Sequence, residues 1–189
     1  ERLQLQPENV VLDLACGTGL NFPYLEERLS SSGRIVAFDY SSAMLSAAHQ
    51  QAQHRGWKNI AFVQGDAARL SLSYQVDGVL STLGISAIPR HREALERGVQ
   101  ALKIGGRISI LDAKLFSGIW RIGNPIIRQA YGQLASWDPT KDIPADLEAL
   151  LGQTTIEEYN RGTIYIVSGV KRPDAGLTSS SLAVPLGSD

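Results

Sequence analysis

Short apolar runs, each closed by turn residues, recur along the chain as far as Asp112. The first, Val10–Ala15, is interrupted only by Asp13. Four more follow, at Arg34–Asp39, Ile60–Val63, Val76–Ser81 and Arg107–Asp112. Continuous runs of this length are typical of strands that are buried on both faces. We therefore predict five strands of a parallel sheet.

Helical patterns fill the gaps between these runs. They cover Leu20–Leu29, a segment from about Ser42 to a stop at Gly56, and a segment from Arg90 to Gly105–Gly106. Strands that alternate with helices form right-handed βαβ units, which place helices on both faces of a parallel sheet. The pattern thus predicts an α/β fold.

The pattern changes after Lys114. Leu115–Trp120 is apolar and aromatic, and Asn124-Pro125 has the signature of a helix start. A short helix is predicted over Pro144–Leu151. It precedes a hairpin of Thr154–Tyr159 and Thr163–Val170, whose short turn requires antiparallel strands. We expect one domain over residues 1–170 and a Ser-, Gly- and Pro-rich tail over 171–189.

The composition is that of an ordinary globular protein, 43% hydrophobic and 20% charged, with a formal charge of −1. Because there is no basic excess, we expect no nucleic-acid partner. One cysteine and three histidines argue against a disulfide framework and a metal site, and the lone thiol favours the reducing cytoplasm. No run approaches the length of a membrane span. Since the sequence begins at Glu1, close before the first strand, we expect that an N-terminal segment has been removed.

The first run leads into a glycine turn, Cys16-Gly17-Thr18-Gly19. Without a Cβ, glycine lets the backbone turn sharply and approach a ligand at the start of a helix. Asp39 follows 20 residues after Gly19, at the end of the second run, where a carboxylate can accept both hydroxyls of a ribose. The third glycine of the dinucleotide fingerprint is missing. Asp13 is an acid inside a buried strand, so we expect it to fasten the glycine loop or to reach the ligand.

Four stretches stand in a fixed order along the chain: Val11–Gly19, Phe38–Leu45, Gly65–Ala67 and Leu102–Arg107. They resemble the class I S-adenosylmethionine-dependent methyltransferases, over about Val10 to Val170. The resemblance is nearest to the ubiquinone/menaquinone-biosynthesis methyltransferases and the related phosphatidylethanolamine N-methyltransferases. It implies a doubly wound, Rossmann-like seven-stranded sheet in the order 3-2-1-4-5-7-6 with the last strand antiparallel. It also implies S-adenosylmethionine as cofactor and S-adenosylhomocysteine as product.

The resemblance implies roles for individual residues. The backbone from Gly17 to Gly19 would face the methionine part of the cofactor, and Asp39 would bind its ribose. Other positions that the resemblance assigns to the cofactor are Asp13, Ala15, Cys16, Tyr40, Met44, Asp66, Ala67 and Ser81. Among these, Tyr40 and Met44 would cover the adenine faces and Asp66 with Ala67 its edge. The segment from Ser81 to Gly84 would line the methyl-transfer site.

Several of these positions have a purely structural alternative. Met44 fits ordinary helix core, Tyr40 could shield the end of the sheet, and Asp66 could cap a turn. Cys16 is interpreted as a small buried side chain rather than a nucleophile, because nothing basic adjoins it. Ala15 stands where the family often has glycine, a change that its small size makes tolerable.

Two features bear on the methyl acceptor. The Asp/Asn-Pro-Pro-Tyr/Phe signature of many amino methyltransferases is missing, and Ser81-Thr82-Leu83-Gly84 stands in its place. The aromatic insertion of residues 115–137 suggests a lid over an amphipathic acceptor, with a helix that packs on the fifth strand as the alternative. The candidates for substrate contact are Tyr24, Trp120, Arg121 and Tyr131.

The predicted function is S-adenosylmethionine-dependent methyl transfer to a small molecule or lipid head group, either a phospholipid amine or a quinone-like acceptor. No catalytic residue is assigned, because a sulfonium methyl is already activated and catalysis is mainly positioning. The expected location is the cytoplasm, and peripheral membrane contact and oligomeric state stay open. The alternatives are a nicotinamide-dependent oxidoreductase and a catalytically silent subunit that binds S-adenosylmethionine.

Overall fold

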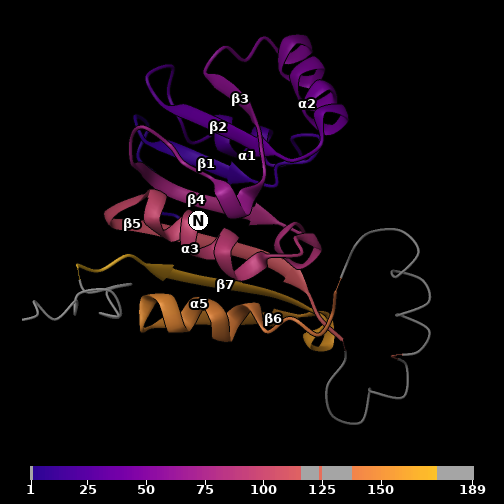
Figure 1. Cartoon of the computed structure of the whole chain (residues 1–189). Coiled ribbons are helices and arrows are strands. Elements are labelled where there is room, and N and C mark those ends of the chain that lie inside the picture. Colours follow the sequence, from indigo (N-terminus) through magenta and orange to yellow (C-terminus); the bar gives the residue numbers. More distant parts are fainter. Residues whose placement is uncertain (1, 116–123, 125–137, 174–189) are drawn as a thin grey trace, which may run out of the picture.

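The computed structural model describes residues 2–115, 124 and 138–173, which form one sheet with helices on both faces (Figure 1). The strands are β1 (Val10–Leu14), β2 (Arg34–Asp39), β3 (Ile60–Gln64), β4 (Val76–Thr82), β5 (Leu102–Ala113), β6 (Thr154–Tyr159) and β7 (Ile164–Val170). They lie in the order β3-β2-β1-β4-β5-β7-β6. Neighbours from β3 to β5 are parallel, and β7 is antiparallel to both β5 and β6. The predicted topology is confirmed.

The helices form a layer on each face of the sheet. They are α1 (Phe22–Glu26), α2 (Ser42–Arg55), α3 (His91–Ala101) and α5 (Ile143–Leu151), with short 3₁₀ turns η1 (Ala67–Arg69), η2 (Ile85–Ala87) and η4 (Asn160–Gly162). Within the described residues, no helix has the length and apolar character needed to cross a bilayer. The described helices pack on the two faces of the sheet.

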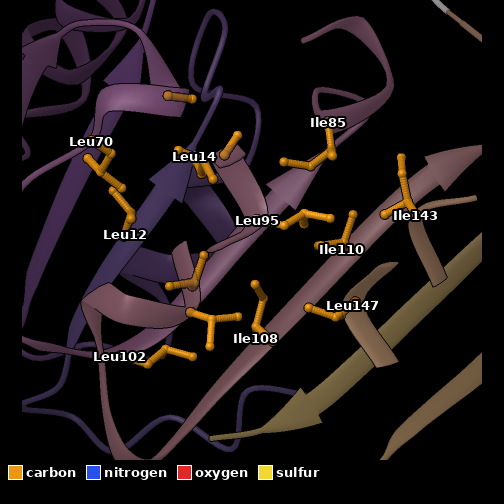
Figure 2. Packing of buried hydrophobic residues seen from close by; sticks show 14 of the residues in the cluster. Leu12, Leu14, Leu70, Ile85, Leu95, Leu102, Ile108, Ile110, Ile143 and Leu147 are labelled. Carbon is orange, nitrogen blue, oxygen red and sulfur yellow. The ribbon is translucent and has the colours of Figure 1, made fainter. Parts of the chain in front are cut away.

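Two apolar clusters hold these layers together. On one face, Phe22 of α1 and Ala48 of α2 pack with alternate residues of the central strands, such as Val11. On the other face, α3 and α5 pack on the intervening residues, and Figure 2 shows Leu95 and Leu147 of these helices near Ile108 and Ile110 of β5. Alternation along each strand thus gives both faces an apolar surface.

The predicted helix over Leu20–Leu29 is wrong in extent, because α1 covers only Phe22–Glu26. The turn before it is held by its own hydrogen bonds, from Gly19 N to Cys16 O and from Phe22 N to Gly19 O, both at 3.0 Å. Pro23 then occupies the first turn of the helix, where its missing N–H costs little. Leu20 and Asn21 therefore precede the helix, which begins at Phe22.

The predicted boundary between the helix that begins near Arg90 and the strand after it is also wrong. Helix α3 ends at Ala101, and β5 begins at Leu102 rather than at Arg107. Leu102 is extended and pairs with Val76 of β4, with a register shift before Gly78. Lys171 fixes this early start, because its ammonium donates to the Leu102 carbonyl at 2.7 Å. The glycine pair after Leu102 consequently lies inside the strand.

Candidate functional site

The candidate site lies at the carboxyl ends of β1, β2 and β4, which are adjacent in the sheet. Four residues on the loops after β1 and β4 have left-handed backbone: Ala15 (φ 57°), Gly17 (55°), Gly19 (85°) and Leu83 (55°). Glycine adopts this conformation freely, whereas Ala and Leu adopt it at a cost. Two of the described non-glycine residues with this backbone, Ala15 and Leu83, thus lie where parallel α/β sheets bind ligands.

The glycine loop is fixed by contacts to the neighbouring strand. Gly17 N donates to Asp39 Oδ2 at 2.8 Å, and Cys16 N donates to Phe38 O at 3.0 Å. Gly19 also needs its small size, because a Cβ built there would lie 2.4 Å from the Phe22 ring. The loop therefore has one defined shape, with the Gly17 backbone close to the acid that ends β2.

Asp39 is nearly buried, with 9% of its surface exposed. One carboxylate oxygen accepts from Gly17 N, and the other accepts from Ser41 N at 2.8 Å. Each oxygen can accept a second hydrogen bond. The side chain is thus held rigidly and keeps capacity for two hydroxyl donors, as a ribose site requires.

Asp13 lies at the bottom of the same loop and is completely buried. Its Oδ1 accepts from Asn21 Nδ2 at 2.9 Å, and Asn21 Oδ1 accepts from the Thr82 hydroxyl at 3.0 Å. Its Oδ2 has no hydrogen-bond partner among the described residues. The pKa of Asp13 is raised to about 7, mainly because the carboxyl is buried. The hydrogen bond from Asn21 lowers this pKa, and the charge of Asp39 raises it. Such an acid is stabilised when a ligand brings a positive charge.

Cys16 is buried between these acids, and its thiol contacts the Gly17 carbonyl at 3.6 Å. Burial first, and then the charges of Asp13 and Asp39, raise the pKa of this thiol far above its ordinary value. A thiol in such surroundings is not a nucleophile at neutral pH. The interpretation of Cys16 as a buried filler agrees with this environment.

The residues predicted for the adenine faces are both exposed. Tyr40 is 78% exposed and Met44, in the first turn of α2, is 45% exposed. The alternative that Met44 is helix core is therefore wrong. The Tyr40 carbonyl accepts from Gln64 Nε2 of β3 at 3.2 Å, which fixes the backbone beside Asp39.

Asp66 caps the turn η1, because its Oδ1 accepts from Ala68 N at 3.0 Å. Its other oxygen accepts from Arg90 Nη2 at 2.5 Å, and Ala67 beside it is buried. The hydrogen bond from Ala68, followed by that from Arg90, lowers the pKa of Asp66. The alternative that Asp66 caps a turn is confirmed. Its role at the adenine edge stays a prediction, and the side chain remains partly exposed.

Ser81 is fully buried, and its hydroxyl has no hydrogen-bond partner among the described residues. Asp13 lies opposite Leu80 in the sheet, so Ser81 points to the other face. The structure therefore does not bring Ser81 and Asp13 together on one side. The two loops do touch, because a Cβ built at Gly84 would lie 2.7 Å from the Ala15 Cβ.

Two residues that the sequence analysis did not select, Asn21 and Gln51, also shape the site. Asn21 bonds to Thr82, which lies in the selected segment Ser81–Gly84, and so connects the loops after β1 and β4. Gln51 of α2, in the amide orientation that satisfies its hydrogen bonds, donates to Thr18 O at 2.7 Å. A buried acid at Asp13 implies a nearby donor, which is the one signal that pointed to Asn21.

A second polar cluster lies on the other face, next to Ser81. Asp112, fully buried at the end of β5, accepts from Ser86 N at 2.9 Å and from the Ser86 hydroxyl at 2.6 Å. Lys141 then donates to Ser86 O at 2.7 Å and to Ile88 O at 2.8 Å. These contacts fix the turn that follows β4.

The substrate candidates are divided between described and undescribed parts of the chain. Tyr24 lies on α1 and is 66% exposed. Trp120, Arg121 and Tyr131 lie outside the described residues, as does most of the predicted lid. Among the residues that the structure describes, no group of three His, Cys, Asp or Glu side chains could hold a metal ion.

A cavity of about 670 Å³ lies at the opposite edge of the sheet, where β2 and β3 begin. Arg34 and Trp57 line it, and none of the residues predicted for the cofactor does. In open α/β sheets, ligands bind beyond the carboxyl ends of the strands. The glycine loop is therefore the better candidate.

Residues 11–106 match a sequence family described as methyltransferase domain. The chain belongs to this family of methyltransferases, and the family and fold identify S-adenosylmethionine as its cofactor. A solved S-adenosylmethionine-dependent methyltransferase from Aquifex aeolicus shares the fold, with a TM-score of 0.66 over 88% of this chain and 84% of its own, at 18% identity. The nicotinamide alternative has no support from these matches.

Among curated relatives, a 2-phytyl-1,4-naphtoquinone methyltransferase of Thermosynechococcus vestitus is 33% identical over 58% of this chain. A demethylmenaquinone methyltransferase of Oceanobacillus iheyensis is 26% identical over 78% of it. The matches cover 48% of the first relative and 68% of the second. The chain thus matches about half of the first relative's length.

Proposed function

We propose that this protein transfers a methyl group from S-adenosylmethionine to a ring carbon of a hydroquinone. The observation that carries the proposal is the rigid glycine loop, whose Gly17 N–H is bonded to Asp39 at 2.8 Å in a chain of the methyltransferase family. The names of the quinone methyltransferase relatives supply the acceptor class.

The residues at the carboxyl edge fit this cofactor. Asp39 keeps acceptor capacity for the ribose hydroxyls. Asp13 Oδ2, which has no hydrogen-bond partner in the described part of the chain, is suited to the ammonium of the methionine part. The exposed side chains of Tyr40 and Met44 would cover the adenine, with Asp66 and Ala67 at its edge.

When bound, S-adenosylmethionine would supply an activated methyl group for transfer from its sulfur to the acceptor's ring carbon, with loss of the ring proton, leaving S-adenosylhomocysteine. The chain's own contribution is to hold both partners in line and to exclude water. The loops that end in Gly19 and Gly84 would provide that alignment, because each is fixed against its neighbour.

The charge distribution favours a quinone-like acceptor over a phospholipid amine. Residues 15–25, which run from the end of β1 into α1, and residues 81–89, which run from the end of β4 through η2, contain no Asp, Glu, Lys or Arg, and Glu26 and Arg90 follow them. At the chain average of 20% charged residues, 20 residues would hold about four. A charged head group needs counter-charges at its site, whereas a neutral ring does not. We extend the proposal to a cytoplasmic protein with peripheral membrane contact and no nucleic-acid partner.

The test is incubation of the chain with methyl-labelled S-adenosylmethionine and, in separate reactions, a demethylated naphthohydroquinone or phosphatidylethanolamine vesicles. We expect label in the naphthohydroquinone only, and loss of that label in Asp39→Ala. Label in the phospholipid would refute the acceptor class. Binding of S-adenosylmethionine without transfer to either acceptor would support the silent-subunit alternative.

A further inference from the structure

One side chain of helix α2 reaches the glycine loop. In the amide orientation that satisfies its hydrogen bonds, Gln51 Nε2 donates to Thr18 O at 2.7 Å and to Gly19 O at 3.3 Å. A Cβ built on Gly19 would lie 3.0 Å from the Gln51 amide. The loop therefore rests directly on this amide, and the glycine at position 19 leaves the room that the contact needs.

The segment of the loop that Gln51 contacts is flanked by two glycines. Gly17 and Gly19, on either side of Thr18, have φ of 55° and 85°. Glycine adopts many backbone conformations, so the peptide between Thr18 and Gly19 can turn without a side-chain clash. Its N–H donates to Cys16 O at 3.0 Å, and its carbonyl oxygen accepts from Gln51. Gln51 thus fixes one side of a peptide that its own residues leave free to rotate.

Helix α2 gives Gln51 a rigid support. Leu45 and Ala48 of this helix pack into the apolar cluster on the sheet. The start of the helix is held by Asp39, whose Oδ1 accepts from Ser41 N at 2.8 Å. An amide on a helix that is fixed in both ways has a defined position, and it can impose that position on the loop.

The position of Gln51 on the helix, rather than its residue type, produces this contact. Gln50 and Gln53 of the same helix are exposed, whereas Gln51 is half-buried. Met44, which is predicted to cover the adenine, precedes Gln51 by seven residues. Since seven residues make about two helical turns, the two side chains lie on the same side of α2. This side of the helix therefore serves both ends of the predicted cofactor site.

We propose that Gln51 is a positioning residue for S-adenosylmethionine, whose amide holds the peptide between Thr18 and Gly19 in the orientation that receives the methionine part of the cofactor. This inference rests on the proposed function, through the assignment of the glycine loop to that part. Gln51 acts through the loop. Its loss lowers the fraction of chains whose loop is ready to bind, and the apparent dissociation constant rises by the inverse of that fraction.

The test compares two ligands in calorimetric titrations of the wild-type chain and of Gln51→Met, which keeps the length of the side chain and removes its donors. S-Adenosylhomocysteine has the amino-acid part of the cofactor, and methylthioadenosine has the adenine and ribose without it. We expect the dissociation constant for S-adenosylhomocysteine to rise about tenfold, a loss that fits one hydrogen bond to the loop, and that for methylthioadenosine to stay unchanged. The matched control, Gln50→Met, makes the same substitution at the exposed neighbour and should change neither constant.

A second variant, Gln51→Glu, gives a readout that a purely structural role would not move. The ionised carboxylate repels the two carbonyl oxygens, whereas the protonated carboxyl donates one hydrogen bond to Thr18 O. The ratio of its dissociation constant for S-adenosylhomocysteine to that of the wild type should therefore fall as the pH is lowered from about 8 to about 5. Both proteins contain Asp13 and Asp39, so the ratio at each pH isolates position 51. The ratio for Gln51→Met, which has no titratable group there, should stay constant.

Equal weakening of both ligands, unchanged affinity in Gln51→Met, or a ratio for Gln51→Glu that does not depend on pH would overturn the inference while leaving the proposed function intact. Failure of the wild type to bind S-adenosylhomocysteine would overturn both.

Discussion

Replacing Asp13 by Asn tests the electrostatics at the base of the glycine loop. Asparagine has nearly the same shape, and its carbonyl oxygen can still accept from Asn21, as Asp13 Oδ1 does at 2.9 Å. The amide nitrogen would then stand where Oδ2 has no partner among the described residues. The substitution thus removes the charge and keeps the hydrogen bond.

The expected magnitude follows from the pKa of Asp13, which burial raises from 3.8 to about 7. Between these two values the folded chain holds a proton that the unfolded chain has lost, so the free energy of unfolding falls as pH rises. The loss amounts to about 4 kcal/mol at about 1.4 kcal/mol per pH unit. This loss of stability is complete above about pH 7, and it should not occur in Asp13→Asn.

Denaturant unfolding at a series of pH values from 4 to 8 measures this difference between the wild type and Asp13→Asn. The variant should gain stability relative to the wild type across that range. Asp112→Asn is the control, since Asp112 is equally buried but both its oxygens accept hydrogen bonds. This control should lose about 1 to 3 kcal/mol, because it disturbs the hydrogen bonds that Ser86 donates to Asp112.

Cofactor binding gives an independent measurement at the same residue. If the ammonium of S-adenosylmethionine meets Asp13, binding lowers the pKa of the carboxyl and releases about half a proton at pH 7. Calorimetric titration in phosphate and in Tris would then give different heats, and Asp13→Asn would abolish the difference. Parallel pH profiles of the two proteins, together with buffer-independent heats, would refute the reasoning.

Three further predictions concern the same edge of the sheet. Asp39→Ala removes the acceptor for Gly17 N and should raise the dissociation constant for S-adenosylmethionine at least tenfold by calorimetry; unchanged affinity would contradict the ribose assignment. Gly19→Ala places a Cβ 2.4 Å from Phe22 at φ 85° and should lower the melting temperature by several degrees, whereas an unchanged value would show that the loop can relax. Lys141→Met loses hydrogen bonds to two carbonyl oxygens and should cost about 1 to 3 kcal/mol in denaturant unfolding, a reading that equal stability would reject.

The strands were predictable because a strand that is buried on both faces has a nearly continuous run of apolar residues. Val11 and Leu12 are both 0% exposed although they point to opposite faces, so β1 is apolar at every position except Asp13. Helix limits were less predictable. The start of β5 depends on Lys171, which is 69 residues from its partner Leu102, and no local pattern carries that information.

The candidate site also has parts that could be predicted from the sequence and parts that could not. Gly17, Gly19 and Asp39 could be predicted, since turn geometry and the end of a strand are local properties. The link from Asn21 to Thr82 could not, because these residues are 61 positions apart and both are ordinary polar residues in the sequence. Only the need of a buried acid for a donor indicated that such a link exists.

Two local rules are broken at the carboxyl edge of the sheet. Asp13 is a buried acid with one unpartnered oxygen among the described residues, and Leu83 is a leucine held at φ 55° with its side chain exposed. Each costs stability in the folded chain. A ligand with an ammonium group would compensate the first cost. Because the Asn21 side chain is hydrogen-bonded both to Asp13 and to Thr82, the residue before Leu83, a substitution at Asp13 should also alter the turn that carries Leu83.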